Sequence, residues 1–168
     1  MANVFPESAA RTLQTSGICA TDVARGVTRM FDRHGLSVLC EVPLPNGRRA
    51  DILAIDTRGQ VTIVEIKVAR ADLHGDAKWP DYLDYCDRFY WALAPELDGS
   101  LLDRDDYLPD RSGVIVADRY DAEIVRAAAT TPMAPARRKA ELLRISRLAM
   151  RRIMIASDPE LAQIHAEV

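Results

Sequence analysis

Apolar residues recur along this chain with two spacings, and the changes of spacing mark the expected elements. A spacing of three and four residues over 21–33 and 135–156 predicts helices. The same spacing over 71–87 is interrupted by Pro80, which must begin a new turn or kink the helix. Dense β-branched runs predict strands at 37–44, 49–55, 61–68, 88–93 and 113–117, and residues 122–127 fit either a short strand or a helix. This order predicts one α/β domain over residues 1–168, with residues 1–20 as a mobile tail.

Two neighbouring strands carry ionisable residues in their interiors. Asp51 interrupts the second strand, and Glu65 and Lys67 interrupt the third. Burial removes the hydration of such side chains, so each must be paired, solvated or functional. Residues 57–59 fit a three-residue hairpin loop that ends in a left-handed glycine. In that register Asp51 lies opposite Glu65, with β-carbons about 4.5–5.5 Å apart.

The alternation of side chains along a strand places Lys67 on the same face as Glu65, while Val64, Ile66 and Val68 point to the other face. Two carboxylates opposite each other repel unless a positive charge neutralises them. A hard divalent cation with oxygen ligands would do so. An ion-paired triad in which Lys67 bridges both carboxylates would do so too. The pattern therefore predicts either a metal site or a structural staple.

Glu41 is the candidate for a third carboxylate, and its place depends on the preceding hairpin. A three-residue loop over 45–47 pairs residue 44 with 48 and sets Glu41 opposite Asp51. A two-residue Asn-Gly turn pairs residue 45 with 48 and directs Glu41 to the other face. Pro45 cannot donate a ladder hydrogen bond, which favours the longer loop. We therefore predict that Glu41 lies within reach of the metal, directly or through water.

Composition narrows the class of protein. The chain has 168 residues, 48% of them hydrophobic, which suits one domain. Its three cysteines lack CxxC spacing and its three histidines lack ligand spacing, so neither a disulfide framework nor a zinc site is predicted. We find no secretory leader and no apolar run long enough to span a membrane. We therefore expect a cytoplasmic protein without a membrane partner.

Positive charge is concentrated in the C-terminal helix, although the net charge of the chain is −3. Residues 137–152 hold seven basic side chains and one acidic side chain, Glu141. On a helical wheel, Arg137, Arg144, Arg147 and Arg151 gather on one side. The other side holds Leu142, Leu143, Ile145, Ala149, Met150, Ile153 and Met154. This pattern fits a ridge that follows DNA phosphates, and it equally fits a core-packed helix with a solvated basic face.

An Asp on one strand followed by Glu-x-Lys on the next resembles the PD-(D/E)XK nuclease superfamily, with Asp51, Glu65 and Lys67 as the motif residues. Longer strings are similar to the bacterial MmcB-type family of DNA-repair proteins over about residues 20–150. They are Gly-Arg-Arg-Ala-Asp at 47–51, Val-Glu-Ile-Lys at 64–67, Lys-Trp-Pro-Asp-Tyr at 78–82, Tyr-Cys-Asp-Arg at 85–88 and Gly-Val-Ile-Val-Ala-Asp-Arg-Tyr at 113–120. The chain departs from the superfamily at Ala50, which occupies the proline position, and in helix 21–33, which offers no matching glutamate.

The resemblance implies a restriction-endonuclease-like core, with a mixed central sheet flanked by helices, and a metal-dependent nuclease that hydrolyses DNA in repair. It implies that Asp51, Glu65 and the main-chain carbonyl of Ile66 bind Mg²⁺, for which Mn²⁺ substitutes, and that Lys67 orients the attacking water. The candidate DNA-binding side chains are Arg48, Arg49, Lys78, Arg144, Arg147 and Arg151.

Several alternatives stay open at this point. The expected partners are branched or damaged DNA and other DNA-repair proteins, and the protein is expected at the nucleoid. Whether it forms a homodimer, and whether it cuts within a strand or from an end, are undecided. An inactive DNA-binding or scaffold protein of the same fold is one rival. An interaction domain whose basic helix docks on an acidic partner is another. Trp79, Tyr82 and Tyr85 either stack on bases or, as we expect, pack their helix over the sheet.

Overall fold

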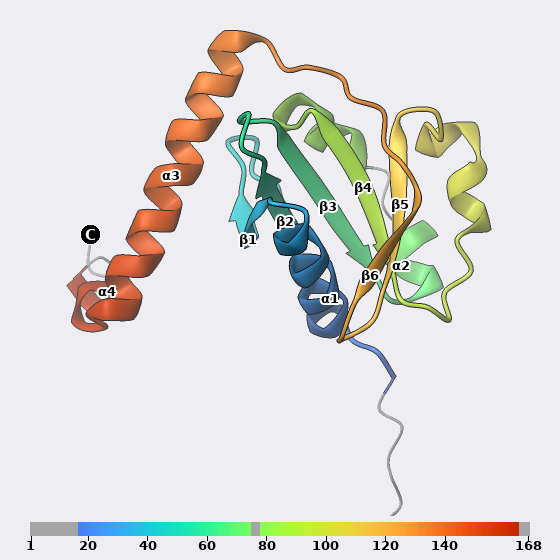
Figure 1. Ribbon diagram of the computed structural model, residues 1–168, viewed down its shortest axis with the longest axis horizontal. Coiled ribbons are helices and arrows are strands. Elements are labelled where there is room, and N and C mark those ends of the chain that lie inside the picture. Colours follow the sequence, from blue (N-terminus) through green and yellow to red (C-terminus); the bar gives the residue numbers. More distant parts are fainter. Residues whose placement is uncertain (1–16, 75–77, 165–168) are drawn as a thin grey trace, which may run out of the picture.

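A mixed β-sheet of six strands forms the centre of the described part of the molecule (Figure 1). The computed structural model describes residues 17–74 and 78–164. The strands are β1 (Ser37–Pro43), β2 (Arg49–Ile55), β3 (Val61–Lys67), β4 (Arg88–Leu93), β5 (Ser112–Ala117) and β6 (Ala122–Arg126). They lie in chain order across the sheet, and β4 is parallel to both β3 and β5 while the other neighbours are antiparallel. The predicted α/β fold, a mixed sheet flanked by helices, is confirmed.

Both hairpins at the start of the sheet have the predicted three-residue loops. Gly59 has a φ of +75° and donates its N–H to the Asp56 carbonyl at 3.0 Å. Gly47 has a φ of +80° and donates its N–H to the Leu44 carbonyl, also at 3.0 Å. Glycine adopts this left-handed conformation without the steric penalty that a side chain brings. The observed pairs are the predicted ones: Ile55 with Val61 and Leu53 with Ile63 in one hairpin, and Val42 with Ala50 in the other.

Helix α1 (Ala20–Arg33) covers one face of the sheet (Figure 1). Its predicted apolar stripe is buried, and it packs with the side chains of β2, β3 and β4 that point to this face. Gly26 allows the helix to approach the β5–β6 turn closely, because a β-carbon there would lie 2.1 Å from the Asp118 carbonyl oxygen. The stripe consists of Val23, Val27, Met30 and Phe31.

Short helices cover the opposite face. They are α2 (Arg70–His74), η1 (Trp79–Tyr85), η2 (Ser100–Asp103) and η3 (Asp105–Tyr107), the last three being 3₁₀ helices. The predicted interruption at Pro80 is confirmed, since the separate 3₁₀ helix η1 begins at Trp79 with Pro80 in its first turn; residues 75–77 lie outside the described ranges. Trp79 and Tyr82 are buried beside Phe89, so they pack this helix over the sheet, as expected. Tyr85 is half-buried under the Arg137 guanidinium.

Helix α3 (Pro135–Ser157) lies beside the free edge of β1 (Figure 1). The division into a buried apolar side and a solvated arginine side, one of the two interpretations of this helix, holds only in part: Ile145 is buried and Arg147 and Arg151 are exposed. Arg144 donates to the Pro43 carbonyl, and Arg152 donates to the carbonyls of Cys40 and Glu41. These arginines thus satisfy backbone acceptors that an edge strand would otherwise expose. The apolar side chains left exposed are Leu143, Met150, Ile153 and Met154.

The remaining segments complete the fold. Residues 122–127, which fitted a strand or a helix, contain strand β6, and the short helix α4 (Glu160–Ile164) after α3 was not predicted. Of the predicted tail over 1–20, residues 1–16 lie outside the described ranges, and α1 already begins at Ala20. None of the helices in the described ranges combines the length and apolar character needed to cross a bilayer.

Candidate active site

Strands β2 and β3 stop pairing next to the predicted carboxylates. Their paired residues extend from the hairpin loop to Ile52 and Val64. Strand β3, by contrast, stays paired with β4 as far as Lys67 and Leu93. The end of β3 therefore keeps one strand neighbour and parts from the other, which creates a fork in the sheet.

The side chains of Asp51 and Glu65 lie in this fork. The Ile66 N–H donates to Asp51 Oδ2 at 2.8 Å, within the ordinary range for such a bond. The Asp51 N–H donates to Glu65 Oε1 at 3.4 Å, so each carboxylate reaches the opposite strand. Side-chain oxygens thus replace backbone partners where the ladder ends. The predicted juxtaposition of the two carboxylates is confirmed.

Lys67 lies on the same face of β3 as Glu65. The alternate residues Val64, Ile66 and Val68 pack on the α1 side, as predicted. Lys67 Nζ lies 5.6 Å from the centroid of the Trp91 ring, on the opposite side, where a cation is attracted by the ring face. Glu65 is 5% exposed and Lys67 is 9% exposed. Charged groups buried to this degree lose their hydration, so each needs an opposite charge or hydrogen bonds within the fork.

Burial raises the pKa of the Asp51 carboxyl above its ordinary value. The hydrogen bond from the Ile66 N–H and the positive charge of Lys67 lower this pKa, but they do not cancel the effect of burial. The negative charge of Glu41 raises the pKa further. Asp51 would therefore gain from a nearby cation in its ionised form. Perturbed carboxyl groups of this kind are enriched at functional sites.

Glu41 occupies the register position predicted from the longer loop, opposite Asp51. The pairs on either side are Cys40 with Ile52 and Val42 with Ala50. Its backbone, however, is left-handed, with a φ of +52°. This conformation is uncommon for a residue with a side chain. The regular alternation of the strand breaks here, which sequence reasoning did not anticipate.

The carboxylate of Glu41 contacts Arg49, with 2.6 Å between Arg49 Nε and Glu41 Oε2. Within residues 17–74 and 78–164, no three His, Cys, Asp or Glu side chains gather in a way that would hold a metal ion. The negative charge of Glu41 raises the pKa of Asp51, which fits their opposite positions in the register. The role of Glu41 as a metal ligand stays a prediction.

The basic residues predicted near the hairpins occupy different environments. Arg48 donates to Asp81 Oδ2 from Nε at 3.0 Å and from a terminal nitrogen at 2.8 Å. Arg49 is 66% exposed at its side chain and pairs with Glu41. Lys78 is exposed, at the residue preceding η1. All three positions border the solvent, but the two arginines already have carboxylate partners.

The arginines of α3 divide into two groups. Arg144 is only 24% exposed and pairs with the buried Glu141, at 2.6 Å. Arg147 and Arg151 are exposed, and neither has a hydrogen bond or ion pair with the described residues. The continuous basic ridge expected from the helical wheel is thus reduced to its solvent-facing members.

A buried ion pair that sequence reasoning missed joins α3 to the sheet. Asp87 is 2% exposed and accepts two hydrogen bonds from Arg138, at 2.6 and 2.7 Å. It also accepts the N–H groups of Val61 and Met133, at 2.7 and 2.9 Å. Because 51 positions separate the two partners in the chain, no local spacing connects them. No signal in a single sequence would have paired these residues.

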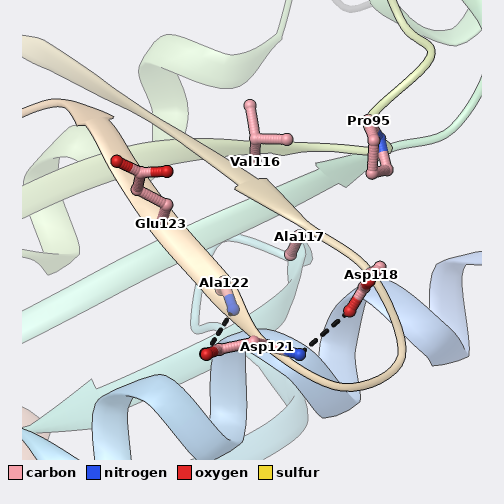
Figure 2. Close-up of a pocket in the computed structure, with 7 residues that line it drawn as sticks. All are labelled: Pro95, Val116, Ala117, Asp118, Asp121, Ala122 and Glu123. Atoms are coloured by element: carbon pink, nitrogen blue, oxygen red, sulfur yellow. Dashed lines mark hydrogen bonds between the residues drawn. The ribbon is translucent and has the colours of Figure 1, made fainter.

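A pocket of about 280 Å³ at the β5–β6 turn shares no residue with the fork (Figure 2). Two of its carboxylates belong to the turn itself. The N–H groups of Asp121 and Tyr120 donate to Asp118 and lower the pKa of its carboxyl. The Ala122 N–H and Arg33 likewise lower the pKa of Asp121. These acidic residues are explained by the turn that they stabilise.

Together, the sheet and the fork define a small α/β protein in which a half-buried carboxylate, Asp51, lies beside a buried carboxylate and a buried lysine. The chain belongs to the DNA repair protein MmcB-like family, whose model matches residues 7–160. The predicted family is confirmed. Among solved structures, the chain is similar to the SPO1766 protein of unknown function from Silicibacter pomeroyi, with 42% identity and a TM-score of 0.74. That similarity covers 82% of this chain and 90% of the other. No curated protein matches the chain.

Proposed function

We propose that this protein is a metal-dependent nuclease that hydrolyses DNA phosphodiester bonds during repair, with a restriction-endonuclease-like core of the PD-(D/E)XK type. The observation that carries the proposal is the meeting of Asp51, Glu65 and Lys67 on one side of the fork. Family membership supports the connection to DNA repair. The cluster supports the chemistry, because opposed carboxylates beside a lysine suit a metal ion and a phosphate together.

The residues at the fork fit a magnesium ion. Mg²⁺ takes oxygen ligands and is usually bound through one or two carboxylates, substrate phosphates and water. Asp51 and Glu65 would supply the carboxylates, and the Ile66 carbonyl would supply a further oxygen. The raised pKa of Asp51 supports this assignment, since a divalent ion would offset the cost of its buried charge. Mn²⁺ also prefers oxygen ligands and would substitute.

Lys67 has the chemistry for two tasks in hydrolysis. Its ammonium would donate a hydrogen bond to the attacking water and orient it toward the phosphorus. It would also offset negative charge that develops on the phosphate oxygens. A bound metal would supply a water of lowered pKa and further shielding of that charge. The Trp91 ring beneath Lys67 restricts where the ammonium lies.

DNA would approach the fork along exposed basic side chains. Arg147, Arg151 and Lys78 are the best candidates, because their charges face the solvent. Arg48 and Arg49 border the fork, but a phosphate would have to displace Asp81 or Glu41 to reach them. Arg144 is a weaker candidate, since its guanidinium holds Glu141 and the Pro43 carbonyl.

The experiment that tests the proposal is cleavage of a panel of linear and branched DNAs with Mg²⁺, with Mn²⁺ and in EDTA. We expect cleavage only with a divalent metal, and a loss of at least about 100-fold in Glu65→Gln and in Lys67→Met. Glu123→Gln, an exposed position on β6, is the matched control and should cleave like the unaltered protein. Undiminished cleavage in EDTA or in both fork variants would contradict the proposal.

The salt dependence of DNA affinity tests the role of α3. Replacing both Arg147 and Arg151 with Ala should weaken binding to all sequences alike. It should also reduce the slope of log affinity against log salt by about two units, because each arginine would release about one counterion. Arg104→Ala, which removes an exposed arginine paired with Asp106, should leave the slope unchanged. An unaltered slope in the double variant would show that Arg147 and Arg151 face the solvent without contacting DNA phosphates.

An inactive DNA-binding protein of the same fold is the second candidate function. The observation in its favour is that Glu41 pairs with Arg49, while the described residues hold no three-ligand cluster. Such a protein would bind DNA with the same salt dependence but would neither bind Mn²⁺ nor cleave. Calorimetric titration with Mn²⁺ separates the two candidates before any substrate is known.

A further inference from the structure

Helix α3 carries an apolar stripe that no other described element covers. Leu143, Met150, Ile153 and Met154 are 57, 63, 65 and 55% exposed. Their spacing places them on one face of the helix, away from the side that holds Ile145 against the sheet. Figure 1 shows this helix at the margin of the molecule, with the sheet on one side only. Contiguous exposed apolar side chains of this kind mark an interaction surface.

The stripe continues into a cavity at the first turns of the helix. This cavity has a volume of about 440 Å³ and is lined by Pro135, Arg138, Lys139, Leu142, Leu143 and Ser146. Leu143 thus belongs both to the stripe and to the cavity wall. An apolar side chain of a partner would contact Leu142 and Leu143 here, and pockets within an interface are where binding energy concentrates.

Basic side chains border the stripe along its length. Arg147 and Arg151 lie one turn apart on its flank, and both are exposed without partners among the described residues. Lys139 lies exposed beside Leu143 at the cavity. Glu141, the only acidic residue of α3, is 4% exposed and is held by Arg144. The face is therefore apolar along its centre and positive at its border.

We propose that this face of α3 binds an amphipathic helix of a partner protein whose apolar stripe is flanked by acidic residues. An amphipathic helix presents apolar anchors at the same spacing as the stripe. Acidic flanking residues would complement Arg147 and Arg151. None of these residues lies at the fork, so the partner site does not depend on hydrolysis there. Arg147 and Arg151 are also the arginines proposed to bind DNA, so a bound partner helix would compete with DNA for them.

Charge disfavours two other occupants of the face. The α3 helix of a second copy would bring no free carboxylate, and in an antiparallel pair it would set arginines against arginines. DNA phosphates would complement the arginines but not the four exposed apolar side chains. Only an occupant that is both apolar and acidic matches the two features together.

The test is fluorescence anisotropy with the full chain and two labelled synthetic helical peptides. Both peptides carry leucines at heptad positions a and d; one has glutamates and the other lysines in the flanking positions. We expect the glutamate peptide to bind at least about tenfold more tightly than the lysine peptide. The double variant Leu143→Gln with Met150→Gln should weaken this binding at least about tenfold. The double variant Arg147→Glu with Arg151→Glu should reverse the preference between peptides.

Four results would overturn the proposal. Equal affinity for both peptides would leave no charge-specific site, and unaltered binding in the Leu143 and Met150 variant would place the peptide elsewhere. A dimer in sedimentation equilibrium that this variant dissociates would assign the face to a second copy. Loss of duplex DNA affinity in the same variant would assign it to nucleic acid. Thermal unfolding checks each variant, whose melting temperature should be unchanged because the altered side chains are exposed.

Discussion

Asp51 and Asp87 are both shielded aspartates, yet their surroundings affect their charges in opposite ways. Burial would raise the pKa of Asp87, but hydrogen bonds from Arg138 and from the N–H groups of Met133 and Val61 hold it below the ordinary value. At Asp51 the effect of burial prevails, and the pKa is raised. The fold compensates the charge of the Asp87 carboxylate, but it does not compensate that of Asp51.

The charge of Asp87 is thus compensated within the fold, whereas burial keeps the charge of Asp51 unfavourable. Asp87, the residue before β4, and Arg138 of α3 form an ion-paired staple. At the fork, the fold leaves Asp51 in a state that an added cation would relieve. The contrast supports the nuclease proposal, because a site for an ion must be incompletely satisfied by the protein alone.

The largest effect should come from breaking the staple. Arg138→Met removes both hydrogen bonds to Asp87 and leaves a buried carboxylate without its cation. We expect the free energy of unfolding, measured by urea denaturation, to fall by about 3–5 kcal/mol. Arg137→Met is the matched control, since Arg137 is exposed and lies 3.9 Å from Asp84; its cost should be about 1 kcal/mol or less. Similar costs in the two variants would show that Asp87 does not depend on its partner.

Replacing each aspartate with asparagine should change the melting temperature by a smaller amount, and the change should be opposite in sign at the two positions. Asp51→Asn keeps an oxygen that accepts the Ile66 N–H and removes an unfavourable charge, so its melting temperature should be equal or higher. Asp87→Asn removes the charge that Arg138 needs, so its melting temperature should fall by several degrees, at about 2–4 °C per kcal/mol. Differential scanning calorimetry in EDTA measures both changes. A clear loss of stability in Asp51→Asn would make the fork a structural staple after all.

The pH dependence of these same variants should give the smallest but most specific signal. Because the folded pKa of Asp51 exceeds 3.8, its charge opposes folding above that raised pKa. The stability gained by Asp51→Asn should therefore be greatest near neutral pH, should begin to shrink as the pH falls to the raised pKa, and should vanish below about pH 4, where the carboxyl is protonated in the unfolded chain as well. Asp87 has a lowered pKa, so its stabilisation persists down to about pH 4 and is lost below it.

Urea denaturation from pH 7 to pH 3 measures both difference curves. Parallel curves for the two variants would contradict the opposite pKa directions. Control titrations of the Glu123→Gln variant, an exposed position on β6, should give no such pH-dependent difference.

The sequence by itself determined the features that depend on neighbouring residues. Gly47 and Gly59 specify the two hairpin loops, because each adopts a left-handed conformation at the end of its loop. The loops set the registers, and the period of two along β3 then places Glu65 and Lys67 on one face. The meeting of Asp51 with Glu65 was predictable for this reason.

Only the tertiary structure decided the features that depend on segments far apart in the chain. The parting of β2 from β3 depends on the continued pairing of β3 with β4. The burial of Arg144 and Arg152 depends on the edge of β1, and that of Arg138 depends on Asp87. A helical wheel records which residues share a face, but it does not record which face meets the sheet. That choice is made by long-range packing and hydrogen bonding, which leave α3 with its arginines partly buried and its apolar stripe exposed.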